Sequence, residues 1–410
     1  MDEENEANMQ VEDPEEKAVQ APTLSKSWSA LKQHIPTFTG GKVVHSKVGL
    51  RGGGEDANLP FLLLPVGGDV SIVDAAEGVT LGTLRGQATA TAAINSGNQD
   101  DGDDDEDDEL DVDAITAYAL SNNDQVVVTC SHNNLMRQYH LTQPSNHQVG
   151  GGKTDKVAEL VRIWGKSGHT LPVTQMEFHL SSVFLATGSV DGTVRVWDGR
   201  NSKSSFLTHL FQRPRHPDAA ATVRGSVTSL TWYPDHSELI LAIGRDDGTL
   251  AIHDLHQKDN APVAVLTDHD AAVTACGWLP IQGLFVSASR DAVVNLWKVK
   301  GSKYRRIHTL PIYEQIEALL VLKPTEKRKV PAVVTAGSKG MVRLWHIEDE
   351  QLQLWKQQAD PFGDARGGYL QMYYHQDISP STPTGGEEQI VVVVIGEEFT
   401  PRYGTNHGRT

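Results

Sequence analysis

An all-β chain built from repeated four-stranded sheets is predicted by three features of the sequence. First, a turn residue stands six positions before an aromatic residue or a histidine at five places, which are Asn133–Tyr139, Asp191–Trp197, Asp247–His253, Asp291–Trp297 and Lys339–Trp345. Second, these pairs recur every 44 to 58 residues, as the units of a repeat architecture do. Third, each unit contains short strand patterns separated by turns. Such units cannot bury both faces alone, so they are expected to stack around an axis as the blades of a β-propeller.

The unit around residues 173–197 illustrates the strand pattern. Residues Val173–Phe178 alternate between apolar and polar side chains, which is typical of a half-buried strand. Residues Val183–Gly188 form a continuous apolar run, as expected of a strand buried on both faces. The pair Asp191-Gly192 then predicts a hairpin turn, and Thr193–Trp197 alternates again. A fourth, more variable strand follows in each unit, for example Ala264–Leu266.

The third strand of this unit ends in Val-Arg-Val-Trp-Asp, and Gly188-Ser-Val-Asp-Gly192 precedes it. These residues resemble the WD-repeat family, whose blades often hold a hydrogen-bonded set of His, Asp, Ser or Thr, and Trp. In two units the His lies 22 residues before the Asp and 28 before the Trp. The resemblance implies two structural hydrogen-bond sets, namely His169, Thr187, Asp191 and Trp197, and His269, Ser287, Asp291 and Trp297.

A histidine, an aspartate and a hydroxyl are also the components of a hydrolase triad. Here the trio recurs at the repeat period, which a single active site would not do. No G-x-S-x-G nucleophile motif occurs in the sequence. We therefore expect no catalytic residues and no enzymatic activity, and we assign the trio to structure.

The composition gives no indication of disulfides, metal binding, a membrane span or a secretory signal. The two cysteines, Cys130 and Cys276, lie in expected strands and do not form a disulfide framework. The 17 histidines show no convincing metal-ligand spacing, so we expect no metal, no cofactor and no small-molecule substrate. No apolar run of 18 residues or more occurs, and the acidic N-terminus lacks the apolar stretch of a secretory signal.

The net charge of −17 comes from two short segments. Residues 1–16 contain 8 acidic and no basic residues, and residues 100–113 contain 11 acidic and no basic residues. The remaining chain is close to neutral, with 34 acidic and 36 basic residues. Segments this polar and this charged are expected to be disordered. A solvating insert is the favoured interpretation of residues 100–113, and a contact with a basic ribosomal or histone-like surface is the alternative.

The predicted domain organisation is a seven-bladed WD-repeat β-propeller with acidic disordered segments. We expect an acidic disordered tail at 1–34, the propeller at 35–398 with a disordered insert at about 87–112, and a disordered end at 399–410. Residues Ile35–Thr39 are the candidate strand that closes the ring. Blade seven begins with Tyr369–Tyr374 and Ile390–Ile395, after which no closing aromatic follows. The propeller is therefore expected to be truncated within the seventh blade.

Function is inferred from a narrower resemblance. Across residues 35–375 the order of the blades and their local sequences are similar to those of a propeller of the nucleolar small-subunit processome. Within this range, Thr309–Glu317 is the stretch that is least common to WD repeats in general. The resemblance implies a non-catalytic scaffold in the nucleus and nucleolus that supports pre-rRNA processing. Implied partners are other WD-repeat subunits of the processome, with pre-rRNA or a small nucleolar RNP as a further partner.

Two basic clusters are candidate contacts for RNA phosphates or for an acidic partner. The first contains Lys298, Lys300, Lys303, Arg305 and Arg306, and the second contains Lys323, Lys327, Arg328 and Lys329. Both are expected in loops between strands, where binding residues concentrate, although ordinary solvated loops have the same composition. No aromatic residues are interleaved with the lysines in a way that would support base stacking.

A rival function comes from Trp197-Asp-Gly-Arg200. The form W-D-x-R appears in WD-repeat substrate receptors of cullin-based ubiquitin ligases, and a single copy is a weak signal. An enzyme that uses the central channel of the propeller is a third alternative, for which the sequence offers no constellation.

Overall fold

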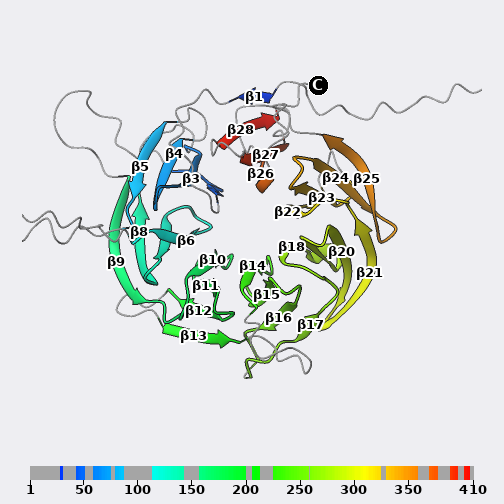
Figure 1. The fold of residues 1–410 in the computed structure, drawn as a ribbon, viewed down its shortest axis with the longest axis horizontal. Helices are drawn as coiled ribbons and strands as arrows, with labels where there is room; N and C mark the ends of the chain where they lie inside the picture. Colours follow the sequence, from blue (N-terminus) through cyan, green and yellow to red (C-terminus); the bar gives the residue numbers. More distant parts are fainter. Residues whose placement is uncertain are drawn as a thin grey trace, which may run out of the picture.

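A computed structural model shows seven sheets arranged in a ring around a central axis (Figure 1). The structure describes residues 28–30, 43–50, 59–74, 79–86, 113–142, 157–199, 206–212, 225–257, 259–324, 329–358, 369–376, 388–395 and 401–406. Each sheet contains four antiparallel strands, so the prediction of an all-β, seven-bladed propeller is confirmed. The predicted acidic tail and the acidic insert fall almost wholly outside the described residues.

The first four blades follow the order of the sequence. Blade one contains β2 (Val44–His45), β3 (Phe61–Val66), β4 (Asp69–Asp74) and β5 (Thr80–Leu84). Blade two contains β6 (Ile115–Leu120), β7 (Val126–Ser131), β8 (Leu135–Leu141) and β9 (Ala158–Lys166). Blade three contains β10 (Val173–Phe178), β11 (Phe184–Ser189), β12 (Val194–Asp198) and β13 (Phe206–Phe211). Blade four contains β14 (Val227–Trp232), β15 (Ile240–Arg245), β16 (Leu250–Asp254) and β17 (Ala264–Leu266).

The last three blades complete the ring. Blade five contains β18 (Val273–Leu279), the 3-10 turn η1 (Pro280–Gln282), β19 (Leu284–Ser289), β20 (Val293–Lys300) and β21 (Lys303–Pro311). Blade six contains β22 (Ile316–Leu322), β23 (Ala332–Gly337), β24 (Val342–Glu348) and β25 (Gln351–Gln358). Blade seven contains β26 (Tyr369–Gln376), β27 (Glu388–Ile395), β28 (Pro401–Asn406) and β1 (Trp28–Ala30).

Blade seven differs from the prediction of a truncated blade. Strand β28 pairs with β27 from Gly404 to Pro401, inside the segment that the sequence predicts to be a disordered end. The short strand β1 then pairs with β28, with Trp28 opposite Asn406. It lies inside the predicted tail, while the expected closing strand, Ile35–Thr39, lies outside the described residues. The prediction failed because β28 carries neither the turn aspartate nor the closing aromatic, whereas backbone pairing along β27 needs neither.

A β-bulge occurs near the start of the innermost strand in six blades, after the first residue of β6, β10, β14, β18, β22 and β26. In three consecutive blades the bulge residue is a threonine that reaches the next blade. Thr174 Oγ1 donates to the carbonyl of Val227 at 2.9 Å, Thr228 to that of Val273 at 2.7 Å, and Thr274 to that of Ile316 at 2.7 Å. We call these contacts the threonine latches. Blade six has Glu317 at the equivalent position.

The apolar core lies between neighbouring blades. In one cluster Val194 and Val196 of blade three pack with Leu230, Trp232 and Ile243 of blade four. Burial of side chains of this size typically stabilises by about 1.5–3 kcal/mol each. Five of the six clusters among the described residues combine side chains of two neighbouring sheets, so these blades complete their cores by stacking, as the repeat pattern predicts.

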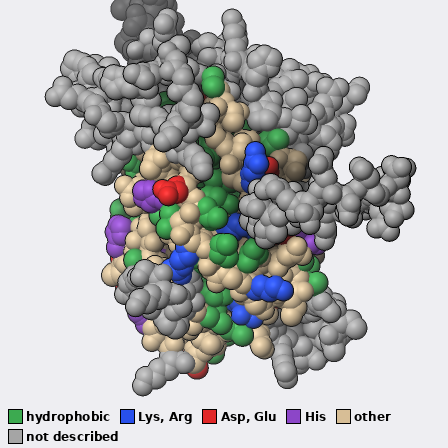
Figure 2. Space-filling view, turned by 90° about the vertical axis from the view of Figure 1, so that its left-hand side faces the viewer, with side chains coloured by type: hydrophobic (Ala, Val, Ile, Leu, Met, Phe, Trp, Pro, Cys, Tyr) green, Lys and Arg blue, Asp and Glu red, His purple; other side chains and the backbone are tan. Residues whose placement is uncertain are grey.

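The outer side of blade two carries exposed apolar residues. Strand β9 has two bulges against β8, at Val161 and at Trp164. Leu160, Val161 and Ile163 are 43, 58 and 52% exposed. Figure 2 shows this side of the ring, with hydrophobic side chains in its middle and Lys and Arg among them. Within the described part of the chain, no helix is long and apolar enough to cross a membrane.

Candidate functional site

The described linkers between blades and the described turns between second and third strands lie on one side of the ring, which we call the top face. Here the structure brings together the first predicted set. Nε2 of His169 lies 2.9 Å from Thr187 Oγ1, and Trp197 Nε1 donates to the same oxygen at 3.1 Å. Nδ1 of His169 lies 2.8 Å from Thr193 Oγ1, a residue that the sequence reasoning left out. The Thr193 hydroxyl in turn donates to Asp191 Oδ1 at 2.6 Å.

The second predicted set has a direct histidine–aspartate contact. Nδ1 of His269 lies 2.8 Å from Asp291 Oδ2, and Nε2 lies 2.8 Å from Ser287 Oγ. Trp297 Nε1 donates to Ser287 Oγ at 3.0 Å. A carboxylate only accepts, so Nδ1–H donates to Asp291 and Nε2 accepts from the Ser287 hydroxyl. The difference between the two blades lies two residues after the aspartate, where blade five has Val293 and therefore no hydroxyl to intervene.

Burial dominates the electrostatics of the first set. It lowers the pKa of His169 to about 4, although the nearby Asp191 carboxylate acts in the opposite direction. The neutral ring is therefore the form present near pH 7. A neutral, fully hydrogen-bonded imidazole fixes the turn and the linker in position.

These sets cannot perform hydrolysis despite their resemblance to a triad. Ser287 and Thr187 are 0% exposed, so no substrate reaches the hydroxyl. Each hydroxyl also accepts the indole N–H of a buried tryptophan. Among the described residues, no group of three or more His, Cys, Asp or Glu could hold a metal ion.

In blades two and six the turn between the second and third strands is held by a carboxylate from the linker, which pairs with an arginine of the third strand. Asp113 accepts from the backbone N–H of Asn133 at 2.9 Å and pairs with Arg137 at 3.4 Å. In blade six the 4% exposed Glu314 accepts from the backbone N–H of Lys339 at 3.0 Å. Glu314 also pairs with Arg343.

These four residues were missed by the sequence reasoning, although a signal exists. The arginine stands two residues before the closing aromatic, and the carboxylate stands two residues before the first strand. Both occur where the turn residue is Asn133 or Lys339 instead of aspartate. In these two blades the carboxylate that binds the turn therefore comes from the linker, whereas in blades three and five it comes from the turn itself.

The other predicted site residues lie on the opposite side of the ring or outside the described residues. Lys298, Lys300, Lys303, Arg305 and Arg306 belong to strands β20 and β21, so the prediction that they lie in a loop is wrong. The alternation of apolar and charged residues in this stretch is that of a two-sided hairpin, with only Gly301 and Ser302 between the strands. Lys327, Arg328 and the ligase-type Arg200 lie outside the described residues, and Lys329 is exposed.

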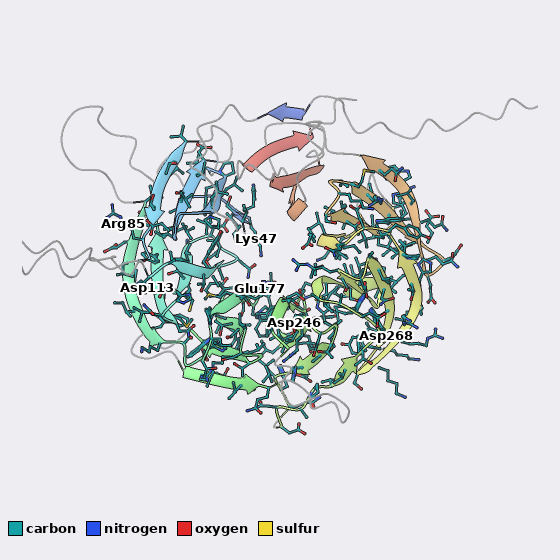
Figure 3. All side chains as sticks on the ribbon, in the orientation of Figure 1. Lys47, Arg85, Asp113, Glu177, Asp246 and Asp268 are labelled. Carbon is teal, nitrogen blue, oxygen red and sulfur yellow. The ribbon has the colours of Figure 1, made fainter. Side chains whose placement is uncertain are left out.

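The inner edge of the ring carries charged groups as well. Figure 3 shows Lys47 and Glu177 at the inner edge of the ring. On the top face Arg290 binds Glu317 through Nε and Nη2, each at 3.0 Å. This bidentate pair joins the turn of blade five to the first strand of blade six.

Comparison with known proteins agrees with this geometry. The family profile described as "WD domain, G-beta repeat" matches residues 159–198 and 260–298. These stretches contain the closing tryptophans of both histidine sets. The fold is a β-propeller with two matched WD repeats, and the chain is similar to the WD-repeat family.

Several curated relatives of this propeller are called transducin beta-like protein 3. The mouse protein (Mus musculus) is 27% identical over 325 residues, covering 77% of this chain and 32% of the relative. The cattle protein (Bos taurus) is 29% identical over 327 residues, covering 78% and 33%. The rat protein (Rattus norvegicus) is 30% identical over 248 residues, covering 59% and 27%. The aligned part is therefore about a third of the length of these relatives.

A solved structure also matches the propeller along its length. A chain of a crystal structure of the mitotic checkpoint complex superimposes with a TM-score of 0.57 and 16% identity, covering 98% of both chains. At this identity the similarity concerns the fold alone.

Proposed function

We propose that this propeller is a non-catalytic scaffold in small-subunit ribosome biogenesis, acting as a processome subunit that supports pre-rRNA processing. The observation that carries the proposal is the alignment with transducin beta-like protein 3 over more than three quarters of the chain. The resemblance implies a nucleolar location and contacts with other WD-repeat subunits.

The chemistry of the top face supports a scaffold. Its buried histidines and hydroxyls bind one another, which leaves them no capacity for a substrate. Blades two and six stabilise their turns through Asp113 and Glu314 instead, so blades two, three, five and six all hold this turn in place by hydrogen bonds. Rigid, differently charged blade edges are what a binding platform requires.

Affinity purification of the tagged chain from cells tests the proposal. We expect other WD-repeat subunits of the small-subunit processome and small nucleolar RNA to co-purify, and the tagged chain to locate to the nucleolus. A matched control is the Glu348→Gln variant, which changes an exposed residue at a hairpin tip and should co-purify equally. Recovery of a cullin adaptor without processome subunits would contradict the proposal, particularly if Arg200→Ala abolished that recovery.

A further inference from the structure

The β20–β21 hairpin of blade five presents four cations on one face. In the antiparallel register Lys298 stands opposite Arg305, and Lys300 stands opposite Lys303. Residues two apart on a strand point to the same side, so all four side chains share a face. We call this face, defined by Lys298, Lys300, Lys303 and Arg305, the basic hairpin face.

This arrangement does not serve the stability of the hairpin. Like charges directly opposite each other across two strands are destabilising, and here two such pairs follow in succession. Packing on the other face of the hairpin compensates. The Tyr304 ring lies 6.1 Å from that of Trp278 and 6.2 Å from that of Phe285, and burial raises its pKa. The backbone N–H of Val299 also donates to the carbonyl of Gly283 at 2.8 Å.

Carboxylates of the same chain neutralise only part of the positive charge on the basic hairpin face. Lys298 Nζ lies 3.1 Å from Glu350, in the acidic hairpin tip of blade six that also contains Glu348 and Asp349. Within the described ranges no carboxylate forms an ion pair with Lys300, Lys303 or Arg305. The fifth cation of the cluster, Arg306, points to the other face of the hairpin and pairs with Asp268 at 2.7 Å.

The described residues of the second basic cluster, Lys323 and Lys329, lie on the same side of the ring. Strands β18 and β20 both run antiparallel to β19, so the ends of β18 and β20 lie at one edge of the sheet. The first strand of blade six, β22, packs beside β18 and ends at the same side. Lys329, which is exposed, follows that end across a connection between β22 and β23. We call this side, opposite the top face, the bottom face.

The chemistry of the basic hairpin face favours a phosphate backbone over a protein partner. Its cations are mainly lysines, which are depleted in the cores of protein interfaces. The ring of Tyr304 packs into the core, so strands β20 and β21 as described offer no aromatic platform for bases. One large apolar side chain, Ile281 at 84% exposure, lies in η1, which contacts the hairpin near its tip, and single exposed apolar residues are ordinary.

We infer that the basic hairpin face binds the phosphodiester backbone of single-stranded RNA without reading its sequence. The inference deepens the proposed function, on which it rests only for the biological source of the RNA. Cations held on a rigid hairpin contact successive phosphates and release condensed counterions. Contacts of this type position RNA on a scaffold and carry no sequence information.

Fluorescence anisotropy with the purified full chain and a short labelled single-stranded RNA of mixed sequence tests the inference. We expect the logarithm of the affinity to fall with the logarithm of salt concentration by about 0.7 per phosphate contact. The double variant Lys300→Gln/Lys303→Gln should reduce that slope by about 1.4 and lower the affinity by about tenfold or more at low salt. The matched control Lys166→Gln/Lys339→Gln removes the same charge at strand ends and turns of the top face and should bind as the wild type does.

Three results would overturn the inference. The wild type fails to bind the RNA, or the hairpin variant binds as tightly as the wild type, or both double variants lose affinity equally. Binding of a polyglutamate peptide in place of RNA would assign the face to an acidic protein instead. Co-purification with processome subunits is measured separately, so a variant that keeps those subunits but loses RNA distinguishes failure of the site from failure of the proposed function.

Discussion

His169 and Asp191 do not form a direct hydrogen bond, since Nδ1 lies 3.6 Å from Oδ2 and the hydroxyl of Thr193 joins them. In blade five the equivalent histidine and aspartate are in contact at 2.8 Å. The same four-residue spacing thus produces two hydrogen-bond arrangements, and one residue two positions after the aspartate decides between them.

The first prediction concerns acid stability. The pKa of His169 is lowered to about 4, whereas an unfolded histidine titrates near pH 6.5, so the unfolded state binds the proton first as the pH falls. The stabilisation is complete above about pH 6.5 and is lost as the pH approaches about 4. Its full size is on the order of 3 kcal/mol. Chemical unfolding from about pH 7.5 to about pH 4.5 should therefore show a shallower pH dependence in His169→Gln than in the wild type. The exposed control His236→Gln should follow the wild type, and parallel curves for all three proteins would contradict the prediction.

The second prediction concerns the shared hydroxyl of blade five. Replacing Ser287 with Ala removes the partner of both Trp297 Nε1 and His269 Nε2. Each buried polar group left without a partner costs about 1–3 kcal/mol, so we expect a loss of roughly 2–4 kcal/mol in the free energy of unfolding. Urea denaturation measures it, with the exposed Ser338→Ala as control. Equal stability of the two variants would show that the set contributes nothing.

The third prediction concerns a threonine latch. In Thr274→Val the shape is kept, while the hydrogen bond to the carbonyl of Ile316 at 2.7 Å is lost. The expected destabilisation is about 1–2 kcal/mol, measured by denaturation. Thr80→Val on the exposed strand β5 is the matched control and should change little. A Thr274→Val variant as stable as the control would mean that the latch has no net effect.

The fourth prediction concerns Glu314. Its neutral substitute Gln leaves the buried side of Arg343 without a carboxylate, and burial already lowers the pKa of that guanidinium. Removal of one member of a buried ion pair typically costs about 3–5 kcal/mol, and the 15% exposed Arg343 places Glu314→Gln toward the lower end. In a double-mutant cycle with Arg343→Leu, the two losses should be strongly non-additive. Additive losses would indicate that the pair does not interact.

The fifth prediction concerns the close approach of blades five and six. A Cβ at Gly277 would lie 2.2 Å from Val321 Cγ2, so Gly277→Ala should cost about 1–3 kcal/mol through overpacking. The second change Val321→Ala should restore part of that loss. Gly82→Ala, where the nearest atom is at 3.5 Å, is the control. If Val321→Ala worsened Gly277→Ala, another contact would have to be responsible.

The blades could be predicted because their signals are local. A turn residue and a closing aromatic six positions later lie on one hairpin, and the strand alternation between them records which side is buried. The pairing of β1 with β28 could not be predicted in the same way, because it depends on backbone hydrogen bonds between the two ends of the described chain.

Among the site residues, too, those with a regular sequence spacing could be predicted, and those that depend on distant partners or lack a distinctive pattern could not. The spacing of His269, Asp291 and Trp297 predicted a contact that the structure contains. Thr193 was overlooked because a threonine in a strand has no distinctive pattern, and Glu314 because its partner Arg343 is 29 residues away. Charge density located the basic hairpin face, while its strand register shows which cations share a side.

The threonine latches run from blade three to blade six and end at Glu317, whose carboxylate cannot donate to the blade that follows. The latches therefore join blades three, four, five and six in series, and the position that would extend the series to blade seven holds no hydroxyl donor. Under a pulling force, the contact between blades six and seven is expected to separate before a latched contact does, because it lacks this additional hydrogen bond.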